Sequence, residues 1–129
     1  MERRHVNPWE WQHPFGYSQA WRVDEPRSII YLAGQVPITP DGTPLADADF
    51  DTQARQVFDN IGAVLAEAGA GFDNIVKVTV YLTDISYLQR YREIKAEYVK
   101  GRQPASTALE IKGLAVPGLL IEVEATAVL

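Results

Sequence analysis

The sequence contains no cysteine, which excludes disulfide bonds, thiolate metal sites and a cysteine nucleophile. It also lacks a glycine-rich phosphate loop, because neither GxGxxG nor GxxxxGK[ST] occurs in it. No apolar run is long enough to span a bilayer, and the polar start does not resemble a signal peptide. These absences favour a cytoplasmic protein.

Basic residues are too few and too scattered to predict a nucleic-acid interface. The 129 residues include 12 Lys and Arg against 17 Asp and Glu, which gives a formal net charge of -5. Phosphate binding requires a basic patch or stripe, and the sequence contains no local basic run. The length indicates a single domain over residues 1–129, which can bury about two-thirds of its unfolded surface.

The apolar pattern predicts an α+β domain with the element order β-β-α-β-α-β-β, in which both helices cover one sheet face. Residues 1–15 contain prolines and aromatic residues, and we expect an irregular N-terminal arm whose rings dock on the body. Two strands, 17–23 and 28–33, are predicted to form a hairpin, and a third strand is predicted at 75–82. Two more strands are predicted within 104–129, on either side of a Pro-Gly turn. The predicted helices are 51–68 and 86–100.

The last predicted strand separates polar from apolar residues. Ile121 and Val123 fall on one face, and Glu122 and Glu124 fall on the other. Two explanations remain open for the glutamates: a solvated sheet face, or a cleft formed against another subunit. A carboxylate in a partly dehydrated cleft can exchange protons with water, so Glu122 is the candidate catalytic residue.

The two histidines do not predict a metal site or a catalytic triad. His5 and His13 both lie in the N-terminal arm, without cysteines and without helical HxxxH spacing. None of the serines has a motif that marks a nucleophile. We therefore expect the imidazoles to be surface groups that help to seat the arm.

Short stretches spread along the chain carry a family resemblance. They are Gly16-Tyr-Ser-Gln-Ala20, Ala33-Gly-Gln-Val-Pro37, Asp41-Gly-Thr-Pro44, Gln53-Ala-Arg-Gln56, Phe58-Asp-Asn60, Asp73-Asn-Ile-Val-Lys-Val-Thr-Val-Tyr81, Pro104-Ala105 and Ile121-Glu-Val-Glu-Ala-Thr-Ala-Val128. In order and spacing, residues 16–129 resemble the Rid family (reactive intermediate deaminases, formerly YjgF).

The resemblance implies a chorismate-mutase-like fold and a homotrimer with three ligand clefts between neighbouring subunits. Family members of the best-known type hydrolyse enamine and imine intermediates, such as 2-aminoacrylate, to a 2-keto acid and ammonia. They use no metal and no organic cofactor. The implied partners are a small-molecule metabolite and further copies of the chain, with no nucleic acid and no membrane.

The resemblance also implies roles for single residues. Glu122 matches the family glutamate that positions or activates the hydrolytic water. Tyr17 matches the tyrosine near the cleft. Ala33 and Gly34 lie at the strand-end turn that lines the cleft, where backbone amides can bind a carboxylate or carbonyl oxygen.

The main departure from the family pattern is Ser106, which stands where the deaminases carry an arginine that clamps the substrate carboxylate. Thr107 and Ala108 follow it, and we count all three as candidate ligand-binding residues. Serine offers no charge, and Lys112 is roughly 20 Å further along the strand. We therefore expect no positive charge to replace the arginine, and weak or absent deamination of 2-aminoacrylate-type imines.

The interpretation that combines these observations is a cytoplasmic Rid-family homotrimer. It binds a small carbonyl, imine or enamine metabolite between subunits and is a candidate for hydrolysing it with Glu122 and water, with altered specificity. A non-catalytic metabolite-binding or regulatory trimer is the alternative. Ribonuclease activity is a third reading, which the acidic charge balance disfavours.

Overall fold

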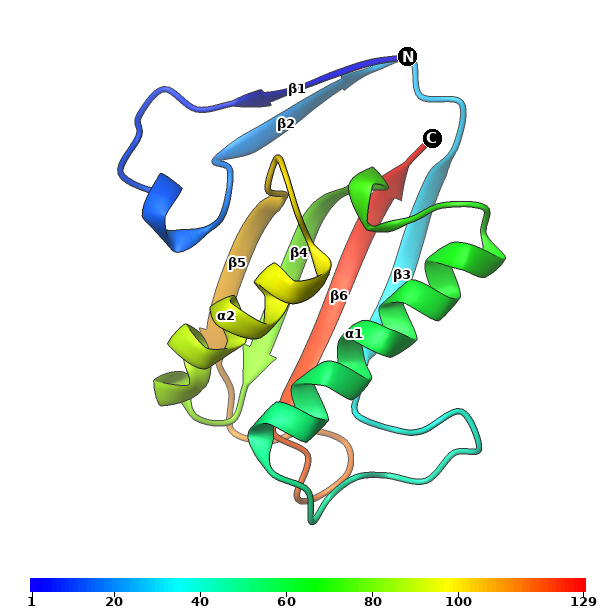
Figure 1. The fold of residues 1–129 in the computed structure, drawn as a ribbon, viewed down its shortest axis with the longest axis vertical. Coiled ribbons are helices and arrows are strands. Elements are labelled where there is room, and N and C mark those ends of the chain that lie inside the picture. Colours follow the sequence, from blue (N-terminus) through cyan, green and yellow to red (C-terminus); the bar gives the residue numbers. More distant parts are fainter.

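A four-stranded mixed sheet, two helices on one of its faces and a separate two-stranded hairpin make up the computed structural model, which describes residues 1–129 (Figure 1). The strands are β1 (Glu2–Val6), β2 (Ala20–Asp24), β3 (Ile29–Gln35), β4 (Ile75–Leu82), β5 (Ala105–Glu110) and β6 (Ile121–Val128). The helices are α1 (Phe50–Glu67) and α2 (Leu88–Tyr98), with short 3-10 turns η1 (His13–Phe15), η2 (Phe72–Asn74) and η3 (Ile85–Tyr87).

The main sheet has the strand order β3-β6-β4-β5. The final strand, β6, runs antiparallel between β3 and β4, while β5 joins β4 in parallel at the edge. The two C-terminal strands are therefore not neighbours, although only a loop separates them in sequence. The α+β class, with both helices over one face, is confirmed (Figure 1).

Alternation in the central strands builds the core against α1. In β4 and β6, every second residue is buried against the helices, and α1 contributes Val57, Ile61 and Leu65 from the predicted helical face. Asp49 caps α1, because its carboxylate accepts a hydrogen bond from the Thr52 amide at 2.8 Å. No helix in the structure combines the length and apolar character needed to cross a membrane.

Two local predictions are wrong. The irregular arm contains a strand, because β1 pairs antiparallel with β2, and the predicted hairpin of 17–23 with 28–33 does not form, because β3 pairs with β6 instead. Strand β1 is mostly charged and lacks the apolar alternation that marks a half-buried strand. Ring contacts stabilise it, since the Arg3 guanidinium and the His5 ring each lie 5.7 Å from the Trp21 ring.

Three hydrogen bonds attach the N-terminal segment to the β5 side of the domain. Trp21 Nε1 donates to the Gln103 carbonyl at 2.8 Å, and the Ser18 amide donates to the Pro104 carbonyl at 3.1 Å. Lys95 Nζ donates to the Gly16 carbonyl at 2.7 Å. These contacts fix the path of residues 15–18 beside α2 and β5.

The prediction that aromatic residues dock the arm is wrong for two of the rings. Trp9 and Trp11 stack on each other, with ring centres 6.1 Å apart, and remain 54% and 57% exposed. Both lie in the loop between β1 and η1, where Trp11 also meets the edge of the Tyr17 ring at 6.3 Å between ring centres.

Gln53 is a buried polar residue that joins α1 to the loop before β6. Its Nε2 donates to the carbonyls of Ala48 and Gly118, both at 3.1 Å, and its Oε1 accepts from the Leu120 amide at 2.8 Å. Replacing Gln53 with Leu leaves these backbone groups without partners, so we expect the free energy of unfolding to fall by roughly 2–4 kcal/mol. Urea unfolding at fixed protein concentration measures this change.

Gln56 on the same helix is the matched control. It is half-buried and its side chain bonds only to Asn60 Oδ1, at 2.8 Å. Gln56→Leu should therefore cost less than about 1 kcal/mol. Equal losses for the two variants would show that the backbone contacts of Gln53 contribute no special stability.

Candidate functional site

The residues predicted to form one site fall into two groups on opposite faces of the sheet. Glu122 is paired in register with Tyr81 and lies on the face that carries no helices. Ser106 is paired with Val78, whose side chain belongs to the core under the helices. Because side chains alternate across a strand, a single subunit does not bring Glu122 and Ser106 together.

Glu122 packs closely against the backbone of β3. The β3–β6 register shifts between Leu32 and Gln35, so that Ala33 and Gly34 lie at an irregularity in the ladder. A Cβ atom at Gly34 would lie only 2.7 Å from Glu122 Cδ. A side chain at position 34 would therefore have to move the Glu122 carboxylate, which occupies the space of a Cβ atom.

Other polar groups on the open face are paired with one another. Tyr81 Oη donates to Glu124 at 2.7 Å, and this bond together with partial desolvation raises the pKa of Tyr81. Lys77 Nζ donates to Thr107 Oγ1 at 2.7 Å. Thr107 therefore lies on the open face, away from its sequence neighbour Ser106.

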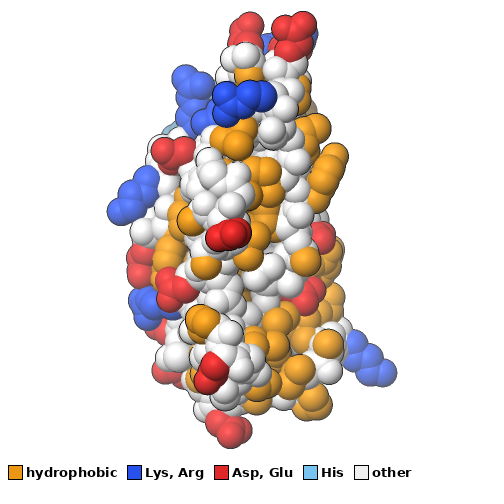
Figure 2. Space-filling model, turned by 90° about the vertical axis from the view of Figure 1, so that its right-hand side faces the viewer, with side chains coloured by type: hydrophobic (Ala, Val, Ile, Leu, Met, Phe, Trp, Pro, Cys, Tyr) orange, Lys and Arg blue, Asp and Glu red, His pale blue; other side chains and the backbone are white.

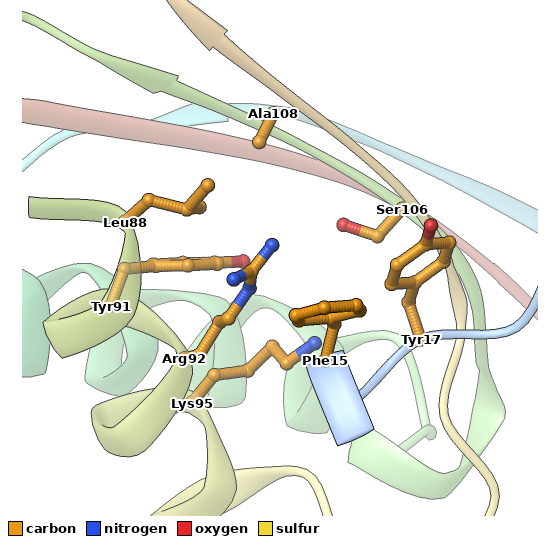
Figure 3. A pocket seen from close by; sticks show the side chains of 8 residues that line it. All are labelled: Phe15, Tyr17, Leu88, Tyr91, Arg92, Lys95, Ser106 and Ala108. Carbon is orange, nitrogen blue, oxygen red and sulfur yellow. The ribbon is translucent and has the colours of Figure 1, made fainter. Parts of the chain in front are cut away.

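The second group surrounds a cavity of about 250 Å³ between α2 and β5 (Figure 3). Ser106 and Ala108 reach it from β5, and Tyr17 reaches it from the N-terminal segment. Its remaining walls are Phe15, Leu88, Tyr91, Arg92 and Lys95.

Two cations from α2 line this cavity, and no acidic residue lines it. Along the strand, the sequence offers only Lys112 as a replacement for the family arginine, whereas the structure places Arg92 and Lys95 of α2 at the cavity that Ser106 lines. The guanidinium of Arg92 lies 5.0 Å from the centre of the Phe15 ring and points toward the Ser106 hydroxyl (Figure 3). The helical spacing of Arg92 and Lys95 is visible in the sequence, but the strand that α2 faces is not.

Lys95 and Tyr91 are the most deeply buried polar groups of the cavity wall. Lys95 is 3% exposed, and desolvation, with a smaller contribution from Arg92, lowers its pKa to about 8. Tyr91 is 1% exposed, and its hydroxyl has no hydrogen-bond partner. Burial raises the pKa of Tyr91, so this hydroxyl remains a proton donor at neutral pH.

The histidines lie apart from both groups. His5 and His13 line a hollow of about 500 Å³ beside the N-terminal hairpin, together with Asn7 and Glu10. No three His, Asp or Glu side chains lie close enough together to hold a metal ion.

Comparison with known proteins identifies relatives over most of the chain. Residues 12–129 match the family described as Endoribonuclease L-PSP. A RutC family protein from Pyrococcus abyssi is 41% identical over 115 residues, which cover 88% of this chain and 87% of the relative. A human protein named 2-iminobutanoate/2-iminopropanoate deaminase is 38% identical over 112 residues, covering 87% of this chain and 79% of that protein.

Among solved structures, a Rid family protein from Yersinia pestis called YyfB, described as being of unknown function, is similar over its whole length. The TM-score is 0.89, the identity is 33%, and the match covers 100% of both chains. The structural match therefore includes the N-terminal hairpin, whose first strand, β1, lies outside the family match at residues 12–129.

The lowered pKa of Lys95 predicts a pH dependence of stability. The unfolded lysine stays protonated to about pH 10.5, whereas the folded one loses its proton near pH 8, so the free energy of unfolding rises with pH between these values. We expect the wild type to gain about 1–2 kcal/mol from pH 7.5 to 9.5, relative to Lys95→Met. Urea unfolding at both pH values measures the difference.

Lys112→Met is the control, because Lys112 is exposed and far along the chain from the cavity. It should follow the wild-type pH profile. A Lys95→Met profile that parallels the wild type would show that Lys95 keeps its proton in the folded protein.

Proposed function

The chain belongs to the Rid (YjgF) family, and we propose that it binds a small carbonyl, imine or enamine metabolite and hydrolyses the imine to a 2-oxo acid and ammonia. The close packing of Glu122 against Gly34 is the observation that carries this proposal, because it fixes a carboxylate at an irregular strand end. The name of the human relative, an imine deaminase 38% identical to this chain, supports the same chemistry.

In the proposed reaction, Glu122 accepts a proton from a water molecule as the water oxygen attacks the carbon of the protonated imine. The tetrahedral intermediate then carries a hydroxyl and an amino group on that carbon. Glu122 returns the proton to the nitrogen. The carbon–nitrogen bond then breaks as Glu122 accepts the hydroxyl proton and the 2-oxo group forms, and this proton passes to the released ammonia, which leaves as ammonium. Backbone amides at Ala33 and Gly34 are proposed to bind the ligand oxygen. No step requires a cofactor.

We further propose that the active form is a cytoplasmic homotrimer. Only a neighbouring subunit can supply Glu122 to the cavity that contains Ser106, because one subunit holds these residues on opposite sheet faces. The open face also needs a partner, since Tyr31 is 78% and Ile29 49% exposed on β3. Figure 2 views the molecule from the right-hand side of Figure 1, where β3 and α1 lie, and shows hydrophobic side chains exposed between acidic ones.

RNA cleavage, which the description of the matched family names, is less well supported for this chain. With 17 acidic and 12 basic residues, the surface repels a phosphate backbone. The alternative is a protein that binds a metabolite without converting it. Absence of ammonia release in the activity assay below would favour this alternative.

If the protein is a trimer, its mass in solution is about three times the 14.4 kDa of the chain. Light scattering coupled to size-exclusion chromatography measures this mass directly. A mass near 14 kDa would contradict the trimer and the shared site.

Glu122→Gln should lower the rate of imine hydrolysis by about 10²–10⁴-fold, because an amide cannot accept the water proton. The assay follows ammonia release from 2-iminobutanoate, generated in solution by an amino-acid oxidase, above the spontaneous rate. Because Gln has the same size, folding and assembly should remain intact. Wild-type turnover in this variant would exclude Glu122 as the proton acceptor.

Gly34→Ala tests the same site from the backbone side. The added Cβ must displace Glu122, so activity should fall while the fold persists. Gly113→Ala is the matched control, because a Cβ there meets nothing within 4 Å. Equal activity of the two alanine variants would show that the close packing has no catalytic role.

A further inference from the structure

Arg92 has no acidic partner, unlike two other arginines of the helical layer. Arg90 pairs with Asp51 at 2.6 Å and Glu93 at 3.3 Å, and Arg55 pairs with Glu97 at 2.9 Å. The Arg92 guanidinium forms no ion pair and no hydrogen bond, and its only close contact of this kind is the face of Phe15. An aromatic face supports the guanidinium plane and leaves its N–H edge free for a ligand.

The cavity has an excess of positive charge that its own residues do not neutralise. Lys95 already uses one donor on the Gly16 carbonyl, and its ammonium lies buried beside Arg92. In a chain of net charge -5, two cations facing one cavity without a carboxylate are an unusual arrangement. An anionic ligand would relieve this repulsion.

Tyr91 supplies an independent sign of a missing ligand. Its buried hydroxyl reaches the cavity and has no partner in the protein (Figure 3). A buried donor without a partner destabilises a fold, and such groups generally have a ligand or a water as partner. The Ser106 and Tyr17 hydroxyls lie on the opposite side of the same cavity (Figure 3).

We propose that Arg92 binds the carboxylate of a short-chain 2-oxo or 2-imino acid in this cavity, and that the Tyr91 hydroxyl donates a hydrogen bond to the ligand's oxo or imino group. The guanidinium fork matches a planar carboxylate, and Phe15, Leu88 and Ala108 provide apolar walls for a short alkyl chain. The ligand class rests on the proposed function, but the anion site rests on the cavity alone.

The decisive measurement is the affinity for 2-oxobutanoate, by isothermal titration calorimetry, in the wild type and in Arg92→Gln. We expect binding by the wild type and a loss of at least tenfold in Arg92→Gln. Arg27→Gln is the matched control, because Arg27 is exposed just before β3, at the opposite edge of the sheet. Undiminished binding by Arg92→Gln, with its folding verified by circular dichroism, would overturn the proposal.

Two further ligands test the chemistry of recognition. The neutral ketone 2-butanone has a methyl group in place of the carboxylate of 2-oxobutanoate and is otherwise the same molecule. It should bind at least tenfold more weakly than 2-oxobutanoate. Inorganic phosphate should also bind more weakly, because it lacks the alkyl chain. Equal binding of 2-butanone, or tighter binding of phosphate, would show that the cavity does not recognise a 2-oxo carboxylate.

Tyr91→Phe separates a ligand contact from a structural role. Because it removes a hydroxyl without a partner, the melting temperature should stay equal or rise, while affinity for 2-oxobutanoate falls several-fold. A lower melting temperature with unchanged affinity would remove Tyr91 from the site.

A double variant moves the positive charge from the helix to the strand. Ser106→Arg in the Arg92→Gln background should restore binding of 2-oxobutanoate. Failure to restore binding in a folded variant would contradict recognition of a carboxylate in this cavity.

A failure of the proposed anion site and a failure of the proposed hydrolysis would give different results. Arg92-dependent binding without ammonia release from 2-iminobutanoate would support this inference and contradict hydrolysis. Ammonia release that is unaffected by Arg92→Gln would support hydrolysis and contradict this inference.

Discussion

Strand β6 is hydrogen-bonded on both sides, and the alternation of its side chains determines what each face of the sheet can do. Its apolar residues lie under the helices, where Ile121 and Val123 are fully buried. A shift of one residue would place Glu122 and Glu124 in that core, at a cost of several kcal/mol for each buried carboxylate. The register that forms the core therefore also fixes the carboxylates on the open face.

The opposite face carries a different compromise between stability and binding. The cavity between α2 and β5 contains a buried lysine, a buried tyrosine hydroxyl without a partner and an arginine without an acid. The lysine and the tyrosine do not stabilise the isolated chain, because each buries a polar group with incomplete compensation. Side chains of this kind persist in folds where a ligand or a neighbouring subunit completes their contacts.

The sequence predicted the elements that depend on local patterns. Helix α1 begins and ends within one residue of its predicted bounds, because its apolar spacing, Asp49 cap and following glycine all agree. The alternation in β6 likewise separated the buried face of the sheet from the open face correctly. Strand partners depend on long-range packing, and so the pairing of β1 with β2 could not be read from the charged segment Glu2–Val6.

The site shows the same division between local and long-range information. The absence of a charge at Ser106 is evident in the sequence, whereas the two cations that share its cavity, Arg92 and Lys95, lie there only because α2 packs beside β5. Arg92 and Ser106 are 14 positions apart and belong to different elements, so no spacing rule connects them. Only the parallel placement of β5 beside β4 brings its first residues under α2 and next to the N-terminal segment.

In the site that we propose, a helix carries the positive charge and a strand does not, which changes how a ligand is held. A guanidinium fixed to β5 would approach from the sheet, whereas Arg92 extends from α2 with its guanidinium carbon over the Phe15 ring (Figure 3). Phe15 is held in turn by the Lys95 bond to Gly16, so the direction of the charge depends on the N-terminal segment. In the anion site that we propose, this coupling makes the N-terminal segment part of the binding site, and it gives the chain a route to ligand specificity that is separate from the carboxylate on β6.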